Sequence, residues 1–348
     1  MRKPTLKGLK TVTGFDGLIR RVKIQHRLIV SFSILTLVPL LITAAYAYKQ
    51  STDAIKSKIS TYSVEVMNQV SVNIQTELVK IENDSVDIAF SNLVQDTLIA
   101  IDNMRESAKK EAEFRMQKSF GPKFAFFPGV TDALVFSNNM EKLIAYGDMN
   151  FKLNLKPEFL APLFEEAAAK SGAPVWTVSG KEDEEIFGNY EVRQVNYGPN
   201  GILLVRSIRS LDFGVPIGYL LMRFDERYIS NKFNSMDLGS GSKIFVLDGE
   251  GIVVSSDHPD IAVGKPYPES FLIGELQRSR EKETFTFNGT VNGKPHLVAF
   301  AYIPAADWYV VSTIPFTYLN NESVGMWKTI AVLGIACALI ALYLSYIV

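Results

Sequence analysis

The chain has 348 residues, of which 47% are hydrophobic and 21% are charged, and its formal net charge is -1. This composition is typical of a globular protein and excludes a disordered one, while the balanced charge argues against nucleic acid as a partner. The single cysteine, Cys337, excludes a disulfide framework.

The two most apolar stretches, residues 28–48 and residues 329–348, lie at the two ends of the chain and contain no charged residue. A helix needs roughly 20 apolar residues to cross the hydrocarbon core of a bilayer. Residues 1–27 contain eight Lys or Arg and one acidic residue, Asp16. The positive-inside rule therefore predicts a multi-pass protein of the cell membrane with two spans, both termini in the cytoplasm and residues 49–328 outside.

A cleaved signal peptide is the alternative for the first apolar run, because Ala45-Tyr46-Ala47 resembles a cleavage site and follows a basic segment. The run is longer than the apolar region of most signal peptides, which favours an uncleaved anchor. Since the second run ends at Val348, we expect the sequence to be the input half of a larger protein or a truncated copy of one.

Residues 49–120 contain neither proline nor glycine, and apolar residues recur there at steps of three and four. This spacing predicts one amphipathic helix, which would extend on the order of 100 Å if it were continuous. A break near residues 92–96 is the alternative. The helix needs a partner for its apolar stripe, and we expect one part to pack on the following domain and another part on a second copy of the chain. The stripe comprises Ile55, Ile59, Tyr62, Val66, Val70, Ile74, Leu78 and Ile81.

Two units with a similar order of predicted elements follow the helical stretch. Each contains a strand pair, a helix and further strands between Gly, Pro and Asn turns. The first unit is predicted to contain a helix at 157–170 and strands at 131–137, 143–146, 175–179, 187–195, 201–211 and 216–224. A short helix at 225–236 leads to the second unit. That unit is predicted to contain a helix at 268–278 and strands at 243–247, 252–255, 284–288, 295–302 and 308–314.

The string "IFVLDGEGIVVSS" followed by "IAVGKPY", and the closing string "ADWYVVSTIPFTYL", resemble the membrane-proximal unit of double Cache sensor modules. The string "LLVRSIRSLDFGVPIGYLLMRFDERYI" is similar to the end of the membrane-distal unit in sensor histidine kinases of Gram-positive bacteria. The resemblance implies an α+β fold, in which a long N-terminal helix precedes two PAS-like Cache units between two transmembrane helices. The expected parts are a cytoplasmic tail at 1–27, a span at 28–48, a helical stalk at 49–120, a distal unit at 121–224, a proximal unit at 225–315, an exit helix at 316–328 and a span at 329–348.

A sensor of this kind receives signals across the membrane, and the resemblance favours the input module of a histidine kinase whose catalytic part is absent here. Chemoreceptors and diguanylate cyclases use similar modules, so they remain alternatives, as does a tethered extracellular enzyme. We expect no enzymatic activity and no cofactor, because the sequence has no catalytic set and its three histidines lack spaced metal partners. The expected partners are a small-molecule ligand or an extracellular binding protein, membrane lipid and a second copy of the chain.

The resemblance places the ligand pocket in the distal unit, where aromatic walls and a few polar groups are expected. Trp176 and Tyr190 lie on predicted strands, and Tyr146 and Asp148 end the first hairpin. Arg206 alternates with apolar residues on a strand, which predicts a buried guanidinium that needs a partner.

An anion clamp at Arg206 is one interpretation, and we favour the other, an internal ion pair with Asp212 or Asp225. For Trp176 we likewise favour a structural role in the core over a role in ligand binding. The predicted site residues are therefore Tyr146, Asp148, Trp176, Tyr190, Arg206 and Asp212, with no catalytic or metal-binding residue among them. The amino-acid-binding motif of the family, a Tyr, four residues, Arg, one residue and Trp-Tyr, is absent, so the ligand class stays open.

Overall fold

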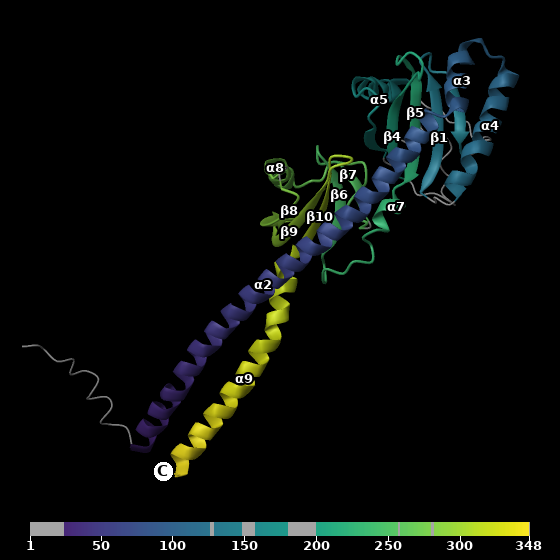
Figure 1. The fold of residues 1–348 in the computed structure, drawn as a ribbon. Coiled ribbons are helices and arrows are strands. Elements are labelled where there is room, and N and C mark those ends of the chain that lie inside the picture. The colour runs from purple at the N-terminus through teal and green to yellow at the C-terminus, as the bar shows by residue number, and fades with distance from the viewer. Residues whose placement is uncertain are drawn as a thin grey trace, which may run out of the picture. The chain divides into compact units, whose positions relative to one another are not determined.

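The computed structural model of the protein describes residues 24–125, 129–147, 157–179, 200–256, 258–279 and 282–347 (Figure 1). It divides into two units. One unit is Ser60–Phe316, and the other contains the two ends of the chain, up to Ile59 and from Thr317 onward. The predicted strand at 187–195 lies outside the described residues.

Helix α2 runs without interruption from Ile24 to Ala89 over 66 residues, with Pro39 inside it. Its first part is apolar on every side, and large side chains such as Val30, Leu35 and Ile42 are exposed. From Ser60 onward the helix is amphipathic, because residues at steps of three and four are buried. The buried stripe consists of Ser63, Met67, Val70, Ile74, Leu78, Ile81, Ser85 and Ile88.

The predicted stripe is confirmed from Val70 to Ile81 but is wrong at Tyr62, which is 51% exposed. The buried stripe includes residue 63 in place of the predicted residue 62. Ser63 is small enough to lie against the fold, so the larger Tyr62 turns to the outer face of the helix.

The helical stretch does not continue as one rod to residue 120. Helix α2 ends at Ala89, and Ser91 caps α3 (Asn92–Ala100) by accepting a hydrogen bond from the Val94 N–H at 3.3 Å. The short helix η1 (Ile101–Asn103) and α4 (Glu106–Ala125) follow. Lys123, near the end of α4, pairs with Asp84 at 2.8 Å and Asp87 at 2.6 Å, so the chain returns to the end of α2. A serine at an N-cap favours the start of a new helix. The cap at Ser91 therefore explains why the helical stretch is interrupted between α2 and α3, next to the break expected near residues 92–96.

The first sheet, called here the N-terminal sheet, has the strand order β2-β1-β5-β4-β3 with antiparallel neighbours. Its strands are β1 (Val130–Ser137), β2 (Lys142–Tyr146), β3 (Val175–Ser179), β4 (Gly201–Arg209) and β5 (Pro216–Asp225). Helix α5 (Pro157–Ala169) covers one face, where Leu160 and Phe164 pack with Leu134, Leu203 and Leu221 (Figure 1). This face is called the α5 face below.

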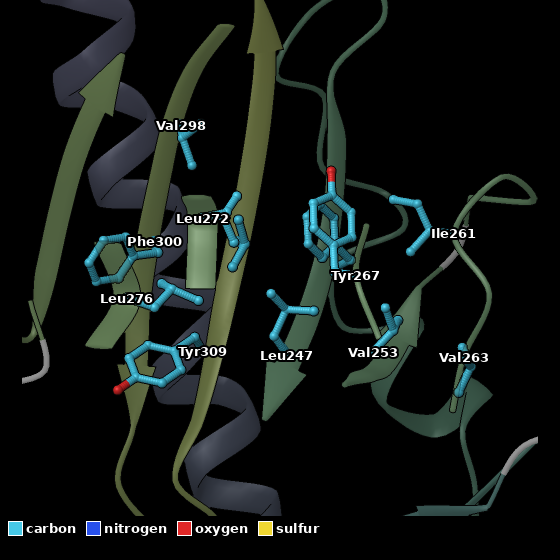
Figure 2. Close-up of a cluster of buried hydrophobic side chains, with 12 residues drawn as sticks. Leu247, Val253, Ile261, Val263, Tyr267, Leu272, Leu276, Val298, Phe300 and Tyr309 are labelled. Carbon is cyan, nitrogen blue, oxygen red and sulfur yellow. The ribbon is translucent and has the colours of Figure 1, made fainter. Parts of the chain in front are cut away.

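The second sheet, called the C-terminal sheet, has the equivalent order β7-β6-β10-β9-β8. Its strands are β6 (Lys243–Asp248), β7 (Val253–Ser256), β8 (Thr284–Val291), β9 (Lys294–Ile303) and β10 (Trp308–Pro315). Helix α8 (Ser270–Arg278) covers one face with Leu272 and Leu276, and Figure 2 shows the apolar cluster beneath it. The same arrangement thus occurs twice, as the sequence predicted.

The joint between the sheets contains a shorter helix than predicted. Only α7 (Arg227–Ser230) is helical, and turns follow to Met236. Asn231 and Asn234 bond to each other at 2.9 Å, and such short polar side chains compete with the helical backbone hydrogen bonds.

Helix α9 (Phe316–Ile347) begins directly after Pro315, the last residue of β10. The predicted exit helix and the predicted second span are therefore parts of one helix. Large apolar side chains such as Val332, Leu339 and Ile340 are exposed on it. Within the described residues, one helix is long and apolar enough to cross a membrane, and it is α2; α9 contributes a shorter apolar stretch, Lys328–Ile340.

Candidate functional site

Two buried charged residues lie opposite each other on the N-terminal sheet. Asp132 of β1 pairs in register with Arg223 of β5, and they are only 1% and 3% exposed. Asp132 alternates with Leu134, and Arg223 alternates with Leu221, so both belong to the α5 face. A carboxylate and a guanidinium therefore interrupt an apolar face where β1 begins and β5 ends.

The hydroxyl group of Thr131 connects the two charges. It lies 2.9 Å from the Asp132 carboxylate, to which it donates, and it accepts a hydrogen bond from the Arg223 guanidinium at 3.1 Å. The register of β1 shifts between Val130 and Asp132, and this irregularity brings the Thr131 hydroxyl to its neighbour's carboxylate. Thr131, Asp132 and Arg223 are called the charged cluster below.

Two glycines make room for the charged cluster. A Cβ atom at Gly201, the first residue of β4, would lie 2.5 Å from Nε of Arg223. A Cβ atom at Gly147, which follows β2 with a φ of +132°, would lie 2.8 Å from Oδ1 of Asp132. Glycine is needed at both positions because any side chain would push the charged groups away. Ser179, the last residue of β3, completes this end of the sheet by donating to the Gly201 carbonyl at 3.2 Å.

This arrangement can recognise a small polar molecule. The carboxylate accepts hydrogen bonds from an ammonium or hydroxyl group, and the guanidinium donates to a carboxylate or another oxygen acceptor. Burial strengthens both interactions because little water competes. The start of β1, the end of β3, the start of β4, the end of β5 and the glycine after β2 lie at this end of the sheet.

Tyr146 is the one predicted site residue that the described structure brings near the charged cluster. It directly precedes Gly147, and its ring lies 4.8 Å from that of Phe124 on α4. Asp148 and Tyr190 lie outside the described residues. Asp212 is exposed on the turn between β4 and β5, at the opposite end of these strands from Arg223.

Trp176 lies on the opposite face of the sheet from the α5 cluster. Its Nε1 donates to the Glu82 carboxylate of α2 at 3.0 Å, and its ring packs against Phe224. The ring also meets Trp308 of the C-terminal sheet at 5.7 Å. Trp176 therefore joins α2 to both sheets.

Arg206 also faces α2, and the structure corrects the favoured prediction of an ion pair with Asp212 or Asp225. In the part of the chain that the structure describes, its guanidinium donates instead to Ser85 Oγ at 3.0 Å and to the Gly172 carbonyl at 2.5 Å. Burial lowers the pKa of Arg206 from its ordinary value, an effect that the Glu82 carboxylate opposes. Backbone carbonyl groups can satisfy a buried guanidinium, which a search for acidic partners does not consider.

Sequence reasoning missed the charged cluster, although a signal was present. Asp132 and Arg223 interrupt the apolar strings "VTDALVFS" and "YLLMRFD" in the same way that Arg206 interrupts its own strand. Applied to every strand, that criterion would have identified both residues. Among the described residues, no group of three or more His, Cys, Asp or Glu side chains is placed to hold a metal ion.

Solved structures with the same fold include a ligand-binding domain, an extracellular domain and a domain of a sensory box protein. The ligand-binding domain of Mlp24, solved with asparagine, is 14% identical, with 78% of this chain and 98% of that chain covered and a TM-score of 0.53. The extracellular domain vpHK1S-Z8, assigned to a histidine kinase, is 13% identical, with 78% and 96% covered and a TM-score of 0.52. A domain from Vibrio parahaemolyticus, assigned to a sensory box/GGDEF family protein, is 14% identical, with 76% and 98% covered and a TM-score of 0.52.

No protein-family model matches the chain, and no curated protein matches it. At this level of identity the similarity shows the fold alone. The expected α+β fold of a double Cache module, with a long N-terminal helix and two sheets, is confirmed by these structures.

Proposed function

We propose that this chain is the extracytoplasmic ligand-sensing input module of a transmembrane receptor, and that its ligand binds at the charged cluster. The burial of Asp132 and Arg223 together, with glycines placed to admit them, is the observation that carries the proposal. Burying two charges is costly in an apolar face, and a binding role gives a reason for keeping them there. The ligand is a small molecule with at least one charged group.

Lipid contact accounts for the apolar ends of α2 and α9. Val30, Leu35 and Ile42 on α2, and Leu339 and Ile340 on α9, are each more than half exposed. Such side chains are stable on the outside of a helix when hydrocarbon surrounds it. Two spans with the basic tail in the cytoplasm would place Ser60–Phe316 outside the cell and both termini inside.

Transmission of the signal would use the continuity of β10 with α9. A ligand that binds one conformation more tightly shifts the population toward it, and a tenfold difference in affinity corresponds to about 1.4 kcal/mol. Since no loop separates Pro315 from Phe316, a shift of β10 is carried directly into α9. Trp176 offers a route from the N-terminal sheet because it contacts α2 and Trp308.

A homodimer is the proposed assembly, supported by a heptad pattern on the outer face of α2. Tyr62, Gln69, Thr76 and Asn83 recur every seven residues, as do Val72, Val79 and Val86. Their spacing is that of the a and d positions of a coiled coil, with Tyr62 and the three valines as the apolar members, whereas the buried stripe occupies other heptad positions. In a Cys337→Ser background, Thr76→Cys should form a disulfide-linked dimer, whereas Gln277→Cys on α8 should not.

The preferred output is a histidine kinase, with a chemoreceptor or a diguanylate cyclase as the alternative. The resemblance of residues 203–229 to kinase input modules supports this preference. A coding frame for a HAMP linker and a kinase domain after codon 348 would test it, and a methyl-accepting or cyclase domain there would contradict it.

Ligand binding is tested with the full chain in lipid nanodiscs and a panel of small ammonium and carboxylate compounds, read by thermal unfolding. We expect at least one compound to raise the unfolding temperature, and Asp132→Asn or Arg223→Lys to remove this effect. Arg209→Lys is the matched control, because Arg209 lies at the far end of β4 and bonds the Gly214 carbonyl. A response that survives both cluster variants would contradict the proposed site.

A further inference from the structure

The C-terminal sheet contains a cavity of about 420 Å³ that is separate from the charged cluster. Lys243 of β6, His296 of β9 and Thr313 of β10 line it from the sheet. These residues alternate with Phe245, Val298 and Val311 of the apolar cluster, so the cavity opens on the face that α8 covers. A volume of this size accommodates a small organic molecule.

The cavity lies at the same place in its sheet as the charged cluster in the other. Each sheet has one long strand at its centre, β5 or β10, next to the first strand of its unit. Lys243 pairs in register with Thr313 where β6 begins and β10 ends, just as Asp132 pairs with Arg223. Both pairs face the helix-covered side of their sheet. The two sheets therefore carry polar residues at equivalent positions.

The acidic side chains that line the cavity are bound to groups of the protein. Asp260 pairs with Lys243 at 3.2 Å, and Glu269 accepts a hydrogen bond from the backbone N–H of Asn292 at 2.8 Å. These contacts lessen the repulsion that both carboxylates would exert on an anion. Lys243 carries three N–H donors, so one contact with Asp260 does not exhaust them.

A further donor points to an acceptor-rich ligand. Nδ1 of His296 donates to the Lys294 carbonyl at 2.8 Å, which fixes the ring beside the cavity and makes Nε2 of the neutral ring an acceptor, so the donor is supplied by another side chain. Burial and the Glu269 carboxylate raise the pKa of Tyr267 to about 12, so its hydroxyl stays protonated and able to donate. Figure 2 shows this hydroxyl pointing away from Leu247 and toward the end of the sheet where Val298 lies.

We propose that this cavity is a second ligand site, which binds a small organic carboxylate through Lys243 and Tyr267, beside the ring of His296. An occupant would lie against β10 at Thr313, two residues before the strand ends at Pro315 and α9 begins. The site would therefore modulate the last strand of the fold independently of the charged cluster.

The test uses the full chain in nanodiscs with ¹³C-labelled histidine, because the sequence has only three histidines and a His296→Gln variant assigns the signal of that residue. Acetate, pyruvate and succinate are titrated at constant pH and ionic strength, with inorganic phosphate and chloride as comparisons. We expect a saturable shift of the His296 signal with at least one carboxylate. No saturable shift, or a shift with phosphate alone, would overturn the proposal.

Variants separate this site from its surroundings. Lys243→Gln and Tyr267→Phe should each weaken the His296 response at least tenfold while the thermal unfolding stays cooperative. Lys294→Gln removes the same charge from an exposed position on β9 and should leave the response intact. Arg223→Lys should also leave it intact. Loss of the response in Arg223→Lys would place binding at the charged cluster and overturn the second site.

Discussion

Trp176 and Trp308 meet edge to face, with ring centroids 5.7 Å apart and an interplanar angle of 67°. One belongs to the N-terminal sheet and the other to the C-terminal sheet, and the indole N–H of Trp176 is bonded to Glu82 of α2. Three elements that are distant in sequence thus converge on one pair of rings. Aromatic pairs of this geometry add about 0.5–1.5 kcal/mol beyond the burial of their area.

Replacing Trp176 with alanine should destabilise Ser60–Phe316 by about 2–3 kcal/mol, because the contacts with Trp308 and Phe224 and the bond to Glu82 are lost together. Chemical denaturation of the full chain in detergent measures the change. Phe213→Ala is the control, since Phe213 is 81% exposed and its loss should have little effect. Equal effects of the two substitutions would contradict a joining role for Trp176.

Arg206→Met should lower the free energy of unfolding by about 2 kcal/mol, because the Gly172 carbonyl and Ser85 lose their buried donor. Arg115→Met on α4 should change it by less than about 0.5 kcal/mol, because the Arg115 side chain is exposed. Denaturant titrations of the two variants give the comparison. If Arg206→Met folded with unchanged stability and lost only ligand binding, the anion clamp considered from the sequence would be correct.

Gly201→Ala should abolish ligand binding at the charged cluster with a smaller effect on folding. The added Cβ atom would lie 2.5 Å from Nε of Arg223, so the guanidinium must move. Gly121→Ala on α4 is the matched control, because no atom lies within 4 Å of the added Cβ atom there. Calorimetric titration with a compound found by the thermal screen distinguishes the variants, and full affinity in Gly201→Ala would exclude Arg223 from the site.

The sequence predicted most of the fold because local patterns determine it. The runs of β-branched and aromatic residues in β1 and β10 and the Asp-Gly turn after β6 each depend on a few neighbouring residues, and these strands were found within about two residues of their ends. Tyr62 and the short α7 were misplaced because tertiary packing decides which side of a helix is buried and where a helix ends.

The charged cluster was harder to predict than the strands that hold it. Asp132 and Arg223 are 91 positions apart, and only the antiparallel pairing of β1 with β5 makes them neighbours. The role of Gly201 likewise depends on a side chain that reaches across from β5. Arg206 seemed to need an acid because its backbone partner, the Gly172 carbonyl, has no signature in the sequence.

Glu226 predicts a pH dependence of stability. It is buried at the joint between the sheets, where it accepts hydrogen bonds from Ser255 Oγ and from the Ser256 N–H at 3.1 Å. Burial raises its pKa from 4.5 to about 7. The folded state therefore retains a proton that the unfolded state releases as the pH rises above 4.5. The stability that Glu226 contributes in this way is complete below the unfolded pKa and is lost as the pH rises to about 7.

The free energy of unfolding should thus fall by about 3 kcal/mol from this group between its unfolded and folded pKa values. Glu226→Gln should remove that part of the slope, as measured by denaturation at a series of pH values. Glu275→Gln on the more exposed α8 is the control and should leave the slope in place. An identical slope in wild type and Glu226→Gln would show that Glu226 ionises normally.

The side of the membrane on which Ser60–Phe316 lies decides whether the chain can sense an external ligand. Single cysteines in place of Gln277 and Thr5, each in a Cys337→Ser background, are exposed on intact cells to a maleimide that cannot cross the membrane. The account predicts that Gln277→Cys is labelled at once and that Thr5→Cys is labelled only after the membrane is permeabilised. Labelling of Thr5→Cys on intact cells, with Gln277→Cys protected, would contradict it.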